Sequence, residues 1–232
     1  MASAPAVGEI RERLRGRLIV SVQAYADSVL NTPETIALLA RCAVANAAAG
    51  VRVEGEARIA AVRAAVEVPI VGIIKREHPG FEPYITSTRA EVGAVARAGA
   101  AIVAFDATAR ARADGSAVAD LVAAAHEAGL AAMADCATRE DLVAAAEAGA
   151  DIIATTLAGY TRATAGRSLP ALELVRAAAA IHPFAICEGG IATPEDARAA
   201  FAAGAAAIVV GTAITNVDAL VRRFTAAAPG TT

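Results

Sequence analysis

Charged and polar residues stand where several apolar runs of this sequence end, and Lys75 is the clearest case. The stretch VGIIKREHPG (71–80) opens as a buried strand, delivers Lys75 and Arg76, and breaks at Pro79 and Gly80. A lysine in such a position can transfer protons as an acid–base group, or form a Schiff base with a carbonyl. Because burying a charge without a partner is unfavourable, this placement indicates a ligand or a paired site.

Other apolar runs end in the same way. The polar residues at or near the predicted strand ends are Gln23, Arg52, Glu54, Asp106, Asp135, Thr155, Thr156, Glu188 and Thr212. Where parallel strands form a barrel, these ends meet at the face that carries the active site. Each residue also has a plainer interpretation, which is contact with solvent or, for Asp106 and Asp135, the capping of a loop.

Glycines follow the last two apolar runs. Glu188-Gly189-Gly190 ends one run and Gly211-Thr212 ends the next. Glycine lets the backbone approach a ligand, and backbone N–H groups in these two loops commonly bind phosphate in barrels. The two loops together predict a phosphorylated ligand.

The helices and strands that would position these residues share a sequence pattern that recurs along the chain. AAAGVRVEG, ARAGAAIVAFDAT, HEAGLAAMADCAT, AEAGADIIATTLA and FAAGAAAIVVGTA each join a helical stretch, Ala-Gly and an apolar run. Glycine commonly ends a helix, and the run after it predicts a strand that is buried on both faces. Three further strands are predicted at 18–24, 69–75 and 184–190. Helices are expected near 33–49, 56–67, 88–98, 116–128, 138–148, 169–181, 193–203 and 216–227.

Strict alternation of strand and helix predicts a parallel sheet with right-handed crossovers. Eight such units in 232 residues fit one (β/α)8 TIM barrel domain over residues 1–232. A short lead (1–16) and a frayed tail (227–232) would flank it. The alternative is a doubly wound open sheet, which is disfavoured because no GxGxxG turn follows a strand.

Composition narrows the class of protein. The chain is 56% hydrophobic with a net charge of −3 and no basic block, which argues against nucleic-acid or membrane partners. Its three cysteines lack CxxC spacing and are expected to be reduced in the cytoplasm. No metal-ligand or dinucleotide pattern appears, so no cofactor is expected. A homodimer through the last helix is considered, although packing on the barrel explains its alanines equally well.

Motifs along the chain resemble those of the N-acetylmannosamine-6-phosphate 2-epimerase family. They are LIVSVQA, GVRVEG, IVGIIKRE, YITST, AFDAT, MADCAT, ATTLAGYT, CEGGIATPEDA and VVGTAIT, spread over about residues 17–225. The resemblance implies a (β/α)8 barrel that interconverts N-acetylmannosamine 6-phosphate and N-acetylglucosamine 6-phosphate in sialic acid catabolism. The phosphorylated amino sugar is then the expected partner.

The resemblance also implies roles for residues. Lys75 would be the catalytic acid/base and Glu188 the second catalytic residue. The residues expected to hold the substrate are Gln23, Arg52, Asp135 and Thr155 on the sugar and Gly189, Gly190, Gly211 and Thr212 on the phosphate. The chain departs from the family pattern at Val22, Ala158 and Gly190, and most of all at Asn216, where the family commonly has arginine.

The reaction implied by the resemblance suggests a catalytic role for Lys75. Inverting carbon 2 requires ring opening, because only the free aldehyde at carbon 1 acidifies the carbon-2 proton. Desolvation and a nearby cation such as Arg52 would favour the neutral amine of Lys75, which could then act as the base. Glu188 would assist ring opening and closure. The alternatives are a class I aldolase with a Schiff base on Lys75, and a sugar-phosphate sensor without turnover.

Overall fold

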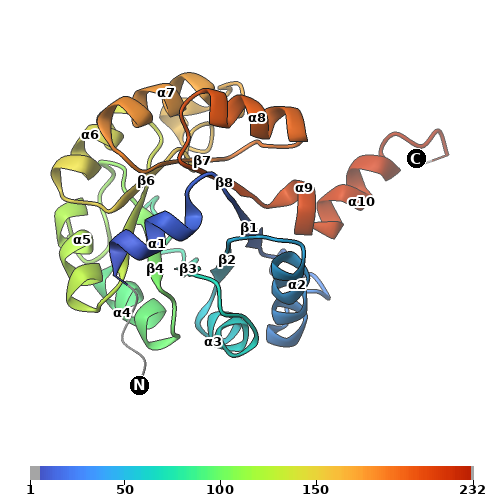
Figure 1. Cartoon of the computed structure of the whole chain (residues 1–232), viewed down its shortest axis with the longest axis horizontal. Coiled ribbons are helices and arrows are strands. Elements are labelled where there is room, and N and C mark those ends of the chain that lie inside the picture. Colours follow the sequence, from blue (N-terminus) through green and yellow to red (C-terminus); the bar gives the residue numbers. More distant parts are fainter. Residues whose placement is uncertain (1–5, 231–232) are drawn as a thin grey trace.

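Eight parallel strands close into a barrel in which sequence order is also spatial order (Figure 1). The structure is a computed structural model that describes residues 6–230. The strands are β1 (Leu18–Val22), β2 (Gly50–Glu54), β3 (Ile70–Ile73), β4 (Ile102–Asp106), β5 (Ala131–Asp135), β6 (Ile152–Ala154), β7 (Ala185–Glu188) and β8 (Ala207–Val210). β1 pairs with β8 at Val20 and Val210, which closes the barrel. The predicted (β/α)8 fold is therefore confirmed, and the open sheet is excluded.

A helix follows each strand, and all of them except the last cover the outside of the barrel. These helices are α2 (Pro33–Ala45), α3 (Glu56–Ala65), α4 (Arg89–Arg97), α5 (Val118–Glu127), α6 (Arg139–Glu147), α7 (Leu172–Ile181), α8 (Pro194–Ala202) and α10 (Val217–Thr225). The hydroxyls of Thr88, Thr138 and Thr193 cap α4, α6 and α8, each within a capping box. No helix within residues 6–230 is long and apolar enough to cross a bilayer.

The N-terminal lead contains a helix that the sequence analysis did not predict. In α1 (Val7–Leu14), Ile10 and Leu14 are almost completely buried and pack against the apolar residues inside the barrel. Nε of Arg11 donates to the backbone oxygen of Asp151 at 3.0 Å, which fastens α1 to the start of β6. The helix therefore closes the N-terminal end of the barrel and leaves the other end for a ligand.

The chain after β8 is arranged differently from the other units. A short helix, α9 (Thr212–Thr215), precedes α10, and α10 extends away from the barrel in Figure 1. No residue of α10 is buried, and Phe224 is 75% exposed. The guanidinium of Arg222 lies 5.1 Å from the ring centre of Tyr25, in the loop after β1. The final residues of the predicted frayed tail, 231–232, lie outside the described residues.

Replacing Leu14 by alanine should lower the free energy of unfolding by about 2–5 kcal/mol, because it leaves a cavity under the barrel floor. Urea denaturation measures the change. Glu9→Ala is the matched control, because Glu9 is exposed on the same helix. Equal stability of the two variants would show that α1 does not support the barrel.

Candidate active site

A cavity of about 600 Å³ opens at the C-terminal end of the barrel. Eight of the predicted site residues line it, namely Gln23, Arg52, Lys75, Glu188, Gly189, Gly190, Gly211 and Thr212. Asp135 and Thr155 do not: both are fully buried behind its wall. The strand ends thus bring together residues that are far apart in the sequence.

Arg52 lies at the centre of the site and is almost completely buried. Its guanidinium makes a two-pronged ion pair with Asp135, with Nη2–Oδ2 at 2.6 Å and Nη1–Oδ1 at 3.1 Å. Nη1 also donates to Oε2 of Glu188 at 2.8 Å. A buried guanidinium requires such partners, and bidentate pairing fixes its plane. Asp135 therefore positions Arg52, while Glu188 faces the cavity.

The carboxyl group of Glu188 titrates near neutral pH. Burial raises the pKa of Glu188 to about 7, and the charge of Asp135 adds to this rise, while Arg52 opposes it. Both protonation states of Glu188 are thus populated at pH 7. A general acid–base group works best in that range.

Thr156 connects the two carboxyl groups. Its hydroxyl oxygen lies 2.6 Å from Oδ1 of Asp135 and 3.2 Å from Oε2 of Glu188. A hydroxyl has one proton to donate, so donation to the nearer Asp135 leaves a lone pair toward Glu188. Where the hydroxyl donates to Glu188 instead, it lowers the pKa of that carboxyl group and so opposes the effect of burial.

The adjacent Thr155 has a different task. Its hydroxyl donates to the backbone oxygen of Glu188 at 3.0 Å and accepts from the backbone N–H of Glu188 at 3.2 Å. These bonds join the end of β6 to the end of β7. Of the two threonines, only Thr156 lines the cavity.

Lys75 lies just beyond β3, which ends two residues earlier than the predicted strand. The ladder stops because Ile74 N–H donates to the hydroxyl of Thr86, and Lys75 then pairs with Ile85 across an antiparallel bridge. The side chain remains accessible from the cavity. Desolvation by the cavity walls lowers the pKa of Lys75, and the charge of Arg52 lowers it further. These are the two causes that the sequence analysis named.

The glycine loops line the side of the cavity next to β7 and β8. Gly190 has φ +77°, and a Cβ there would lie 2.2 Å from Cβ of Leu169, so no side chain fits. This close approach explains why the chain has glycine where the related family often has a larger residue. Gly211 passes Ser21 closely, since an added Cβ would lie 3.1 Å from Cβ of Ser21. Both glycines also line the cavity.

Asn216 has a structural role at the position of the absent family arginine. Its Oδ1 accepts the backbone N–H of Ala219 at 3.0 Å and so caps α10. The hydroxyl of Thr215 donates to the backbone oxygen of Ser21 at 2.6 Å and ties α9 to β1. The turn from β8 into α10 is therefore fixed on both sides.

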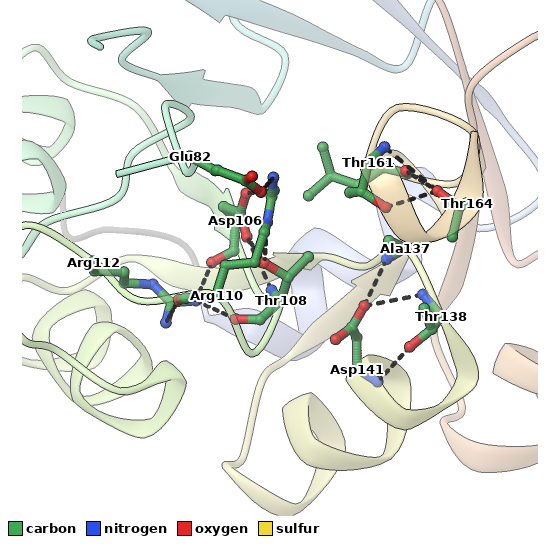
Figure 2. Close-up of polar contacts among 11 residues, drawn as sticks. Glu82, Asp106, Thr108, Arg110, Arg112, Ala137, Thr138, Asp141, Thr161 and Thr164 are labelled. Atoms are coloured by element: carbon green, nitrogen blue, oxygen red, sulfur yellow. Dashed lines mark hydrogen bonds and ion pairs between the residues drawn. The ribbon is translucent and has the colours of Figure 1, made fainter. Parts of the chain in front are cut away.

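Asp106, at the end of β4, is occupied by its own loop. It pairs with Nη2 of Arg110 at 2.6 Å and accepts the backbone N–H of Thr108 at 2.9 Å, as Figure 2 shows. Arg110 also reaches Glu82 at 3.3 Å, which joins the loops after β3 and β4. This is the loop-capping role that the sequence analysis gave as its alternative for Asp106.

Several residues of the cavity wall escaped the sequence analysis. They are Ser21, Tyr25, Tyr84, Tyr160 and Arg223. Tyr84 and Tyr160 occur in the motifs YITST and LAGYT, which could have indicated them, whereas no local pattern distinguishes Arg223. Among residues 6–230, no group of three His, Cys, Asp or Glu residues could hold a metal ion.

Comparisons with known proteins find relatives over most of the chain. Residues 36–229 match the family described as "Putative N-acetylmannosamine-6-phosphate epimerase". A relative from Synechococcus elongatus, named "Putative N-acetylmannosamine-6-phosphate 2-epimerase", is 47% identical over 219 residues, which are 93% of this chain and 94% of the relative. A relative of the same name from Caldanaerobacter subterraneus is 39% identical over 93% of this chain and 92% of its own length.

A solved structure is similar over the whole barrel. It is that of the N-acetylmannosamine-6-phosphate 2-epimerase from Clostridium perfringens, with a TM-score of 0.92 and 35% identity over 98% of this chain and 100% of that one. A thiamine phosphate pyrophosphorylase from Pyrococcus furiosus shares only the fold, with a TM-score of 0.59 and 15% identity over 90% and 92% of the chains. The chain therefore belongs to the N-acetylmannosamine-6-phosphate 2-epimerase family.

Proposed function

We propose that this protein inverts carbon 2 of N-acetylmannosamine 6-phosphate to give N-acetylglucosamine 6-phosphate, a step of sialic acid catabolism. One observation supports this most strongly: an amine with a lowered pKa and a carboxyl group with a pKa near 7 line the same cavity as Arg52. Such a pair suits proton transfer at a carbon next to a carbonyl.

In this proposal Glu188 transfers the proton that accompanies ring opening, because it exchanges protons near pH 7. The aldehyde formed at carbon 1 makes the carbon-2 proton acidic. The neutral amine of Lys75 removes that proton, and return of a proton to the other face completes the inversion. Arg52, held by Asp135, supplies positive charge near the enolate oxygen.

Binding of the sugar phosphate is divided between two parts of the wall. Gln23, whose Nε2 donates to Ser21 at 2.7 Å, and Thr156 would orient the sugar. The backbone of Gly189, Gly190 and Gly211, with Thr212, would contact the phosphate. We also propose the cytoplasm as the location and a homodimer as the assembly, with the exposed apolar residues of α10 at the subunit contact.

Lys75→Met should lower exchange of the carbon-2 proton by about 10²-fold or more, because it removes the base. Proton NMR of N-acetylmannosamine 6-phosphate in D2O follows the exchange. Arg76→Gln is the control, since it removes the adjacent charge outside the cavity. Near-normal exchange by Lys75→Met would exclude Lys75 as the base.

The same lysine separates proton transfer from an aldolase reaction. Lys75 is the only lysine in the sequence, so a Schiff base on a lysine side chain can form nowhere else. Borohydride added during turnover should leave the mass of the Lys75 peptide unchanged. A substrate adduct on that peptide would favour the aldolase alternative.

Thr156→Val should reduce kcat/KM on the order of 10–100-fold, because it removes a hydroxyl shared by two carboxyl groups in the buried network. Thr156→Ser keeps the hydroxyl and should stay close to the wild type. If the valine and serine variants lose activity equally, the threonine methyl group and not the hydroxyl is what the site needs.

Titration of Glu188 also predicts a dependence of stability on pH. Its folded pKa, about 7, lies above the ordinary value of 4.5, so the folded protein holds the proton more tightly than the unfolded chain. That contribution is complete below pH 4.5 and is lost as the pH rises through 7. Urea denaturation at several pH values should show Glu188→Gln gaining stability relative to wild type between pH 4.5 and 7, and no more above. A constant difference would contradict the raised pKa.

A further inference from the structure

The chain that follows β3 leaves the barrel and returns to it as a hairpin-like loop, residues 75–85, called the Lys75 loop below. Lys75 pairs with Ile85, and the N–H of Arg76 donates to the backbone oxygen of Tyr84 at 2.9 Å. Lys75, Tyr84 and Ile85 line the cavity. The base of the Lys75 loop therefore decides how the amine of Lys75 is presented to a ligand.

Thr86 closes the base of the Lys75 loop and is fully buried. Its hydroxyl accepts the N–H of Ile74 at 3.0 Å, and its own N–H donates to the backbone oxygen of Ile74 at 2.7 Å. The pairing of β3 with β4 ends earlier, at Gly72 and Val103. Because buried backbone groups require partners, Thr86 takes the place that β4 would otherwise have beside Ile74. One threonine thus holds both polar backbone groups of the residue before Lys75.

The backbone of Thr86 is strained. Its φ of +42° lies in the left-handed region, which is unfavourable for a side chain branched at Cβ. Among residues 6–230, the other non-glycine residue with a positive φ is Ala47, which is exposed just after α2, where this conformation is common. Thr86 ends no helix. Strain of this kind is found mainly at functional sites, where the surrounding structure maintains it.

The surroundings of Thr86 fix the backbone on both of its sides. The oxygen of Ile85, just before it, accepts the N–H of Asp106 at the end of β4, at 2.9 Å. The N–H of Ser87, just after it, donates at 2.7 Å to the almost completely buried carboxylate of Glu91 on α4. Because β4 and α4 each hold one neighbour, the strained conformation cannot relax by a small shift of the loop.

We propose that Thr86 is a positioning residue for Lys75: its hydroxyl fixes the backbone of Ile74 and thereby keeps the amine of Lys75 directed into the cavity. Alternate residues of a strand face the same side, so Val71, Ile73 and Lys75 face the barrel interior as long as Ile74 stays extended. The inference rests on the proposed function for the reaction that Lys75 catalyses, whereas the position of the amine can be measured without any reaction.

NMR titration of the full-length protein tests the position of the amine. Lys75 is the only lysine, so protein labelled with 13C,15N-lysine gives one side-chain signal, whose pH dependence reports the pKa of Lys75. The charged groups that act on this amine are Arg52, Glu54, Glu188 and Asp135. Desolvation and Arg52 lower its pKa and outweigh the carboxyl groups, which raise it. Thr86→Val keeps the branched shape without the hydroxyl. An amine released toward solvent should therefore show a pKa closer to the ordinary 10.5.

Proton NMR of N-acetylmannosamine 6-phosphate in D2O then measures catalysis. Thr86→Val should lower kcat about 10- to 100-fold, the effect of a misplaced catalytic group, and leave KM near the wild-type value. Thr86→Ser keeps the hydroxyl and should stay close to wild type in both measurements. Thr86→Gly tolerates the left-handed backbone and so folds readily, and it should change kcat and pKa in the same direction as Thr86→Val. Thr138→Val is the control, because it removes a capping hydroxyl from α6 outside the cavity.

The outcomes separate this inference from the proposed function. An unchanged pKa of Lys75 in folded Thr86→Val and Thr86→Gly would overturn the role of Thr86, even if wild type epimerises the substrate. Equal losses in the valine and serine variants, or a shifted pKa without loss of kcat in an active enzyme, would overturn it as well. A pKa shift confined to the variants without the hydroxyl, in a protein whose wild type fails to epimerise, would support Thr86 and reject the epimerase proposal. Circular dichroism verifies that each variant is folded.

Discussion

A single buried cation organises the C-terminal end of this barrel. Arg52 reaches from β2 to carboxyl groups on β5 and β7, so three strands that are distant in sequence depend on one guanidinium. Removing one partner of such a network leaves a buried charge uncompensated, which typically costs about 3–5 kcal/mol. The two partners are not equivalent. Asp135 accepts two hydrogen bonds from the guanidinium of Arg52 and is fully buried. Glu188 accepts one hydrogen bond from Arg52 and is accessible from the cavity. Asp135 thus stabilises the buried Arg52, whereas the carboxyl group of Glu188 can exchange its proton with a ligand in the cavity.

The arrangement around Arg52 also explains the behaviour of its neighbours. The positive charge of Arg52 lowers the pKa of both Lys75 and Glu188, so it favours the neutral amine and the ionised carboxylate together. Glycine at 190 and 211 lets the backbone pass close to Leu169 and Ser21, so both loops can lie against the cavity. At the other end of the barrel, α1 fills the space with Ile10 and Leu14. The polar residues of the site therefore lie at the C-terminal end of the barrel, whereas the N-terminal end is filled by apolar side chains.

Much of this could be predicted from the sequence, because both the fold and the site follow local rules. Apolar runs after Ala-Gly define the strands, and strand ends in a parallel barrel converge, so Lys75 and Glu188 could be placed together. The predictions that failed depend on where each strand ends and how the helices pack, which a short run of residues does not specify. Thr155 and Thr156 are adjacent, and only the end of the ladder at Ala154 decides which one faces the cavity. Helix α1 was missed because its charged residues mask two buried apolar ones. Arg223 lies in a predicted helix, but its approach to the cavity depends on how α10 leaves the barrel.

Helix α10 has a further property, which follows from its lack of buried residues. Elements with little buried surface open at low free energy, well below that of global unfolding. A ligand that contacts the folded helix but not the opened one must stabilise the helix by the same free energy that the helix contributes to binding. Binding of a ligand in the cavity therefore lowers the fraction of molecules in which α10 is open, and opening of α10 weakens the binding of that ligand. A ligand that contacts α10 would in this way also order the helix, and whatever else covers its exposed apolar residues would contribute to the same balance.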